Sequence, residues 1–247
     1  MQRVSYAIFA IIAYLVFLAT FLYLIGFVAG APFLPTSIDH PASALPLAPA
    51  AIVDLMLVGV FGLQHSIMAR SGFKAAWTRV MPPPVERSGY MIFSCLALIL
   101  IFALWQPLPA LLWDVRSTPA AIAIWALFGA GWLIVLLSTF LISHFELFGL
   151  KQVWNHWRGH DAVAPTFRQP FFYKLVRHPL YSGFLLAFYA TPAMTLGHMV
   201  FAAAMTVYIQ AAIRFEERDL IKLFGADYET YRGNVGKLAP RLRRGTM

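Results

Sequence analysis

The chain has 247 residues, of which 60% are hydrophobic and only 12% are charged, and its mean hydropathy is +0.69. A soluble domain of this length could not bury so much apolar surface, so lipid must be the solvent for many segments. The net charge of +8 does not indicate nucleic acid binding, because the basic residues lie in loops and a tail between apolar segments. The single cysteine, Cys95, excludes an internal disulfide, and its apolar surroundings in the sequence predict a packed side chain.

Four apolar runs in the first 148 residues predict membrane-spanning helices. The first run, 6–28, is longer than a signal-peptide core of about 7 to 15 residues, so we interpret it as a retained span. The other runs are 49–68, 88–105 and 118–142.

The last apolar region, 180–213, is interrupted near Thr191-Pro192 and Gly197-His198. These breaks divide it into two helices of roughly 16 to 17 residues, barely enough to cross a bilayer at about 1.5 Å per residue. We therefore expect a short helical hairpin rather than one long helix, and the sequence leaves open whether this hairpin fully spans. Residues 214–224 combine an apolar face with charged positions, which predicts a helix that emerges from the last span.

The sequence thus predicts an all-α integral membrane protein with about five to six membrane-embedded helices, the last two a short hairpin, and a cytoplasmic C-terminal helix. We expect one polytopic domain over residues 1–247, with four spans in 1–148 and the hairpin and basic tail in 149–247. Of the 19 Lys and Arg residues, only Arg116 falls on the opposite side of this arrangement. Because cytoplasmic loops are enriched in Lys and Arg, both termini are expected in the cytoplasm.

Ionisable residues lie at both ends of the predicted hairpin. Arg177-His178-Pro179 precedes it, and Glu216-Glu217 follows it. Basic groups beside a helix N-terminus can bind an anion, and two carboxylates suit an ammonium group or ribose hydroxyls. The pattern therefore indicates a site for a zwitterionic ligand at the cytoplasmic face. The alternative is a salt bridge that joins the two ends without a ligand, and Tyr181 could likewise be an ordinary membrane-interface aromatic.

The hairpin region resembles a known family. Arg-His-Pro-x-Tyr-x-Gly at 177–183, Glu-Glu-x-x-Leu at 216–220 and Phe-Gly-x-x-Tyr-x-x-Tyr at 224–231 are similar to the C-terminal region of the isoprenylcysteine carboxyl methyltransferase superfamily. The tail departs from that pattern at 236–240, where Gly-Lys-Leu-Ala-Pro replaces a Val-Pro turn. The resemblance implies that S-adenosylmethionine is bound by Arg177, His178, Pro179, Leu180, Tyr181, Gly183, Glu216 and Glu217.

Four further segments narrow the resemblance. Tyr-Leu-x-Phe at 14–17, Gln-His-Ser-Ile-Met-Ala-Arg at 64–70, Pro-Pro-x-x-Glu-Arg-Ser-x-Tyr at 82–90 and the segment 143–154 resemble bacterial methanethiol S-methyltransferases. This implies an enzyme of the bacterial inner membrane that methylates methanethiol to dimethyl sulfide. The alternatives are an isoprenylcysteine carboxyl O-methyltransferase, or a non-enzymatic sensor or assembly factor like the NnrU-like membrane proteins linked to nitric oxide metabolism.

A thiol reacts as its thiolate, so a base or a cationic environment is expected near the acceptor. His144 and Glu146 form the preferred catalytic pair, and His65 is a third candidate. These residues also have structural interpretations. His65 could cap its helix, and His144 with Glu146 could be interfacial side chains. Glu86 and Arg87 could form a local ion pair. We expect replacement of His144 to lower turnover with cofactor binding nearly intact. The residues assigned to the acceptor side are Tyr14, Gln64, Glu86, Arg87 and Tyr90.

Two other patterns are weaker evidence for a functional site. His156 and His160 have the i, i+4 spacing of a zinc site, but Gly159 weakens the helix and no acidic residue completes the motif, so no metal is expected. Gly129-Ala130-Gly131 lacks the strand and further glycine of a nucleotide-binding turn and instead predicts close helix packing. The sequence leaves open which base acts, whether other thiols are accepted and the oligomeric state.

Overall fold

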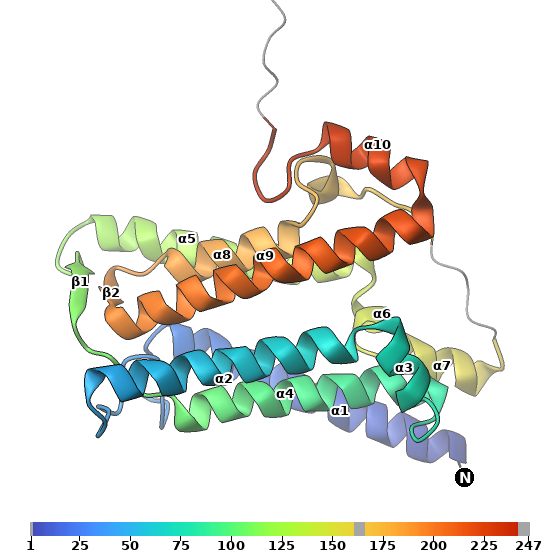
Figure 1. Cartoon of the computed structure of the whole chain (residues 1–247), viewed down its shortest axis with the longest axis horizontal. Coiled ribbons are helices and arrows are strands. Elements are labelled where there is room, and N and C mark those ends of the chain that lie inside the picture. The colour runs from blue at the N-terminus through green and yellow to red at the C-terminus, as the bar shows by residue number, and fades with distance from the viewer. Residues whose placement is uncertain (1, 161–165, 242–247) are drawn as a thin grey trace, which may run out of the picture.

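The described chain, residues 2–160 and 166–241 of a computed structural model, forms two layers of helices (Figure 1). One layer contains α1 (Gln2–Val28), α2 (Leu47–Met68) and α4 (Glu86–Leu104), and the other contains α5 (Ala120–Ile142), α8 (Pro179–Tyr189) and α9 (Leu196–Phe224). The layers meet where α2 packs against α9. Five helices of the described chain are long and apolar enough to cross a membrane, which confirms the predicted all-α integral membrane protein.

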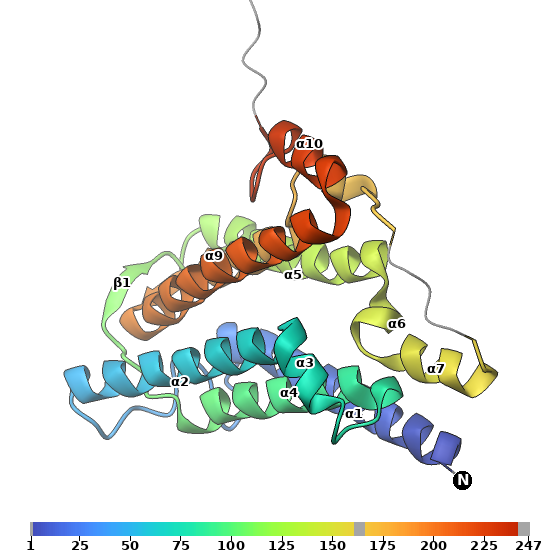
Figure 2. The same ribbon diagram turned by 45° about the vertical axis from the view of Figure 1, so that its right-hand side comes forward.

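The two ends of the bundle differ. At one end, which we name the sheet end, β1 (Leu111–Asp114) pairs antiparallel with β2 (Ala193–Thr195). At the other, the motif end, lie the N-terminus and the short helices (Figure 1). These are α3 (Ser71–Trp77), η1 (Pro83–Val85), α6 (His144–Leu147), α7 (Leu150–Arg158), η2 (Phe171–Lys174) and α10 (Ala226–Asn234). Figure 2 shows that α9 and α2 diverge toward the motif end.

The first four predicted spans are confirmed within a few residues, but the predicted hairpin of two equal helices is wrong. Its first helix, α8, has only 11 residues, whereas α9 has 29 and begins at Leu196. The helix is interrupted over residues 190–195, so the break predicted near Thr191-Pro192 is confirmed, whereas Gly197-His198 lies inside α9. The charged segment 214–224 is a direct continuation of α9, as the sequence predicted, because no residue there interrupts the helix before Gly225.

Glycines allow α8 to pack against α5 at very short distance. A Cβ atom at Gly131 would lie 2.7 Å from the backbone nitrogen of Ala187, and one at Gly183 would lie 2.7 Å from the backbone oxygen of Gly131. No side chain larger than hydrogen fits at such an approach. The predicted small-residue packing is thus confirmed for Gly131, whereas a Cβ at Gly129 would meet nothing within 4 Å.

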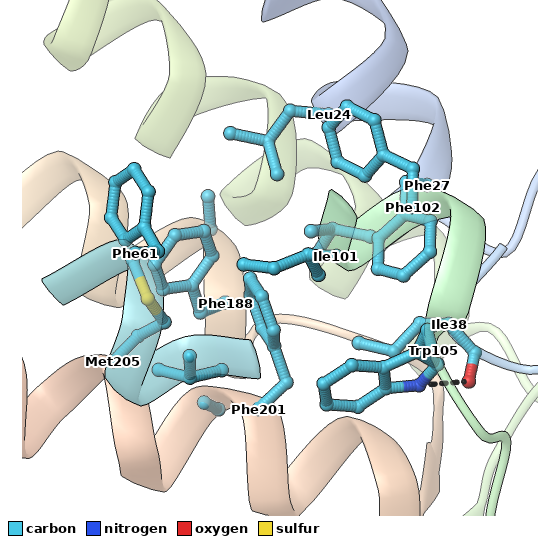
Figure 3. Packing of buried hydrophobic residues seen from close by; sticks show 14 of the residues in the cluster. Leu24, Phe27, Ile38, Phe61, Ile101, Phe102, Trp105, Phe188, Phe201 and Met205 are labelled. Atoms are coloured by element: carbon cyan, nitrogen blue, oxygen red, sulfur yellow. Dashed lines mark hydrogen bonds between the residues drawn. The ribbon is translucent and has the colours of Figure 1, made fainter. Parts of the chain in front are cut away.

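Large aromatic side chains fill the space between the layers near the sheet end (Figure 3). Phe27, Phe188 and Phe201 are fully buried there. Trp105 donates a hydrogen bond from its indole nitrogen to the carbonyl oxygen of Ile38, 3.1 Å away, which satisfies its one polar group (Figure 3). Cys95 is buried in a smaller cluster beside α1, as the sequence predicted.

Polar side chains close the sheet end through defined hydrogen bonds. Thr195 donates to Asp39 at 2.6 Å and accepts from the backbone nitrogen of His198, so it caps α9. Asp54, which lies on α2, accepts from the backbone nitrogen of Gln106 at 2.8 Å, just beyond α4. Asp54 therefore bonds to the backbone that follows α4, which ties α2 to the end of that helix.

Candidate active site

A buried ionic cluster joins the two ends of the α8–α9 hairpin. The Nε–H of Arg177 donates to Oε1 of Glu217 at 2.9 Å, and Nε2 of His178 lies 3.1 Å from the same oxygen. The Arg177 and Glu217 side chains are only 9% and 11% exposed. The predicted charge pair across the hairpin therefore forms, and its first contact is the salt bridge that the sequence offered as the alternative to ligand binding.

The tail turn at 236–240 completes this cluster. The backbone nitrogens of Arg177 and His178 donate to the carbonyl oxygens of Gly236 and Lys237 at 2.8 and 3.1 Å. The Arg177 guanidinium also donates to the carbonyl oxygens of Arg232 and Val235. The tail, whose sequence departs from the resembled family, thus fixes the backbone at the start of α8 through its own carbonyl groups.

Glu216 differs from Glu217 in its freedom to meet a ligand. Its side chain is 45% exposed, and its closest charged partner is Nδ1 of His178 at 3.8 Å. The Tyr181 ring lies 5.7 Å from the His178 ring. Glu216 is therefore the more accessible carboxylate of the two, and Tyr181 packs beside the buried cluster.

His65 lies in the opposite layer and contacts both α4 and α9. Its Nδ1 is 3.1 Å from Oγ of Ser94, and its ring lies 5.1 Å from that of Tyr90 and 6.3 Å from that of Tyr208. The Tyr90 hydroxyl donates to the carbonyl oxygen of His65 at 3.3 Å. His65 therefore packs on the α9 side of its layer and is not a simple helix cap.

The other residues assigned to the acceptor side are dispersed around this set. The amide of Gln64 donates to Sδ of Met68 at 3.1 Å. Arg87 donates to the carbonyl oxygen of Leu147 at 2.9 Å and lies over the Tyr90 ring. Among the described residues Glu86 forms no ion pair, so the predicted Glu86-Arg87 pair is absent there.

His144 lies in a different environment, where α1, α5 and α6 meet. Its Nε2 and the Tyr14 hydroxyl are 2.8 Å apart, and its Nδ1 is 2.8 Å from Oγ1 of Thr139. The ring stacks on Phe140 at 4.1 Å between centroids. Burial lowers the pKa of His144 below its ordinary value, so the neutral imidazole is favoured.

Glu146 does not pair with His144. Its carboxylate accepts a hydrogen bond from Lys151 at 2.6 Å, and both side chains are about half exposed, at 49% and 47%. That hydrogen bond lowers the pKa of Glu146, which keeps it ionised. Glu146 is thus a surface carboxylate in an ion pair, and the two members of the preferred catalytic pair contact different partners.

The His144 region borders an apolar cleft of about 750 Å³ between α1, the end of α5 and α7. Its walls include Ile11, Phe140, Phe145, Trp154 and Trp157. The contacts of His144 and those of His65 share no residue. The structure therefore unites His65 and Tyr90 with the α9 side of the bundle and leaves His144 and Glu146 in a separate region.

Two polar residues near the hairpin were missed by sequence reasoning, namely Ser94 and Tyr208. Each is a single polar side chain inside an apolar helix, a pattern that many membrane helices show. Four buried side-chain oxygens at the motif end have no hydrogen-bond partner in the described part of the chain, namely those of Gln64, Ser88, Gln152 and Tyr228. Such orphaned groups are expected where a polar ligand binds. Within the described residues no cluster of three potential metal ligands occurs.

Comparison with known proteins gives the family of this chain. No family model and no solved structure matches it. It is 48% identical to the methanethiol S-methyltransferase of Mycobacterium tuberculosis (strain H37Rv) over all of both chains. It is also 48% identical to methanethiol S-methyltransferase 1 of Bradyrhizobium diazoefficiens, over 94% of this chain and 81% of the relative. Human Nurim is 31% identical over 70% of this chain and 69% of Nurim. At this identity and coverage, the chain belongs to the methanethiol S-methyltransferase family.

Proposed function

We propose that the protein transfers a methyl group from S-adenosylmethionine to methanethiol and releases dimethyl sulfide. The observation that carries this proposal is the buried ionic cluster of Arg177, His178 and Glu217, in a chain of this family. A cluster of charge beside apolar spans is costly unless it has a function.

The residues at the motif end fit a zwitterionic methyl donor. Glu216 is the more exposed of the two glutamates that follow the hairpin, and it suits the donor's ammonium group or ribose hydroxyls. The buried cluster behind it would hold Glu216 and His178 in place, so Arg177 and Glu217 would serve binding mainly by positioning. S-adenosylmethionine supplies an electrophilic methyl group on a sulfonium. Tyr181, Tyr90 and Tyr208 offer aromatic faces that stabilise such a cation by about 0.5–2 kcal/mol each.

The acceptor needs little recognition. Methanethiol is small and apolar, so it can reach the interior from lipid or from water. Holding acceptor and donor in line can supply several kcal/mol of the barrier reduction. For His144 and Glu146 the proposal is an indirect one: His144 holds Tyr14, α5 and α6 together and so positions the acceptor side, while Glu146 contributes a surface ion pair.

The direct test uses the full chain in lipid nanodiscs with methyl-labelled S-adenosylmethionine and two possible acceptors, methanethiol and a prenylated cysteine peptide. We expect labelled dimethyl sulfide in the headspace. Labelled methyl ester on a prenylated cysteine peptide, without dimethyl sulfide, would indicate a carboxyl methyltransferase instead. Binding of the donor with neither product would indicate a non-enzymatic role and overturn the proposal.

The site is proposed to face the cytoplasm of a bacterial cell. The supporting observation is that Arg116 lies beside β1 at the sheet end, whereas Arg70, Lys74, Lys151 and Arg177 lie at the motif end. Intact cells carrying Arg116→Cys or Glu229→Cys, in a Cys95→Ala background, test this with a membrane-impermeant maleimide. Labelling of the Arg116→Cys protein alone is expected, and labelling of the Glu229→Cys protein alone would reverse the orientation.

A further inference from the structure

The proposed reaction must remove a proton from a thiol, and the two histidines of the bundle interior differ in whether they can accept it. A neutral imidazole has one ring nitrogen that donates a hydrogen bond and one that accepts. A neighbouring group that can only accept from one nitrogen makes that nitrogen the donor and leaves the other as the acceptor. The hydroxyl groups beside His65 and His144 therefore determine the chemistry of each ring.

Ser94 fixes the tautomer of His65. Its hydroxyl donates to the carbonyl oxygen of Tyr90 at 3.0 Å, one turn earlier in α4. A hydroxyl has a single proton, so a Ser94 hydroxyl that donates to Tyr90 accepts from His65, and Nδ1 of His65 then carries the hydrogen. The acceptor nitrogen of His65 is consequently Nε2, which has no hydrogen-bond partner among the described residues.

Thr139 favours the same tautomer in His144, but there the acceptor nitrogen is already hydrogen-bonded. The Thr139 hydroxyl donates to the carbonyl oxygen of Leu136 at 2.7 Å, so it too accepts from an Nδ1–H. Nε2 of His144 is then the acceptor, but it receives the Tyr14 hydroxyl at 2.8 Å. The lone pair of His144 is occupied, and that of His65 is available.

We infer that His65 is the general base for the thiol and that Ser94 is its positioning residue. The inference rests on the proposed function. Nε2 of His65 takes the proton of methanethiol, and the thiolate sulfur forms a bond to the methyl carbon as the bond from that carbon to the sulfonium breaks. Dimethyl sulfide and S-adenosylhomocysteine result, and the imidazolium returns its proton to water.

The titratable groups that face His65 are Tyr90 and Arg87 of α4 and Tyr208 of α9. Arginine stays charged and tyrosine stays neutral between about pH 6 and 9. A pH profile of turnover that depends on the His65 side chain reports on the base itself.

The experiment compares His65→Asn, Ser94→Ala and Ser94→Thr, with Ser138→Ala as the matched control. Ser138 is a buried serine of α5 that bonds to no histidine in the described chain. General base catalysis contributes about 10²–10⁴-fold, so we expect a loss of turnover of at least about 100-fold in His65→Asn at neutral pH. Its turnover should then rise with pH as the thiol ionises without help, while donor binding stays within about twofold.

Nitrogen NMR of histidine-labelled protein gives a readout that does not need turnover. The His65 signals, assigned by their loss in His65→Asn, should show hydrogen on Nδ1 in the native protein. Ser94→Ala should lose this preference and about tenfold in turnover, Ser94→Thr should regain both, and Ser138→Ala should change neither.

The outcomes are separable. Absence of dimethyl sulfide from the native protein would overturn the proposed function. With an active native protein, an unchanged rate and pH profile in His65→Asn would overturn the assignment of the base. Hydrogen on Nε2 in the native protein would overturn the role of Ser94. If His65→Asn fails to bind the donor, Ser94→Ala and the tautomer measurement still decide the question.

Discussion

Two regions of the molecule contain the same kinds of side chain in different arrangements. We name the first, with His65, Ser94 and the Arg177–Glu217 pair, the interlayer region. We name the second, with His144, Thr139 and the Glu146–Lys151 pair, the peripheral region. Each has a histidine held by a hydroxyl on a neighbouring helix, an aromatic cluster and a glutamate that pairs with a basic residue. In the interlayer region the glutamate pair is buried and Nε2 is open. In the peripheral region the pair is exposed and Nε2 is occupied by Tyr14.

The difference teaches that residue type and position along a span do not separate a reactive histidine from a structural one. Both histidines end or follow a predicted span. What separates them is the environment of Nε2. In His144 this nitrogen meets Tyr14 of another helix, and in His65 it has no partner among the described residues. Four predictions test the contrast between the two regions.

The largest effect is expected from Glu217→Ala. Removing this carboxylate leaves Arg177 and His178 without their shared partner, and breaking a buried pair costs about 3–5 kcal/mol. We expect a marked fall in melting temperature and a loss of donor binding of at least about 100-fold in calorimetric titration. Glu216→Ala should weaken binding with an unchanged melting temperature. Equal behaviour of the two variants would show that the buried and exposed glutamates do not have separate roles.

Displacing α8 should damage the interlayer region alone. Gly131→Leu places a side chain where a Cβ already meets the α8 backbone at 2.7 Å. Overpacking of this kind costs about 1–3 kcal/mol, and the start of α8 carries His178. We expect lower thermal stability and weaker donor binding. Gly129→Ala is the matched control, because a Cβ there meets nothing, and a similar loss in that variant would contradict the packing argument.

The third prediction concerns the pH dependence of the peripheral region. Because burial lowers the pKa of His144 below its ordinary value of 6.5, protons bind the unfolded chain more readily. The stability contributed by the neutral ring is present above pH 6.5 and is lost as the pH falls through the folded-state pKa. His144→Gln should reduce this acid sensitivity in thermal melts and lower turnover about tenfold with donor binding nearly intact. Loss of donor binding would refute the separation of the regions.

The smallest effect is expected from Glu146→Gln. An exposed ion pair contributes about 0–1 kcal/mol, and the carboxylate of Glu146 contacts Lys151 rather than a histidine. Melting temperature and turnover should stay close to those of the native protein. A tenfold fall in turnover, measured beside Lys151→Ala, would restore Glu146 to the catalytic role that its sequence position suggested.

The spans could be predicted because hydropathy and length are properties of contiguous segments. The boundaries of α1, α2, α4 and α5 follow directly from the apolar runs. For the hairpin, the interruption at Thr191-Pro192 could be predicted, but not the pairing of β2 with β1, which lies some 80 residues earlier. No local signal in Ala193–Thr195 specifies that partner.

The candidate site was predictable only in part, for the same physical reason. The pair of Arg177 and Glu217 could be expected because both lie at the ends of one hairpin. The partners of His65 and His144 could not, because Ser94 and Tyr14 come from helices whose rotation is set by packing. Hydropathy gives the depth of a residue in a span but not the neighbour that its ring nitrogen meets.

The shortness of α8 has a consequence for how the protein is made. At about 1.5 Å per residue its 11 residues extend roughly 16 Å, about half of a hydrocarbon core of about 30 Å. Such a segment cannot enter the bilayer as an independent transmembrane unit during translation. It must be accommodated against the Gly131 surface of α5 and closed by α9, which emerges from the ribosome later. The residues at its start that we propose to bind the donor are therefore brought together only at the last step of membrane assembly.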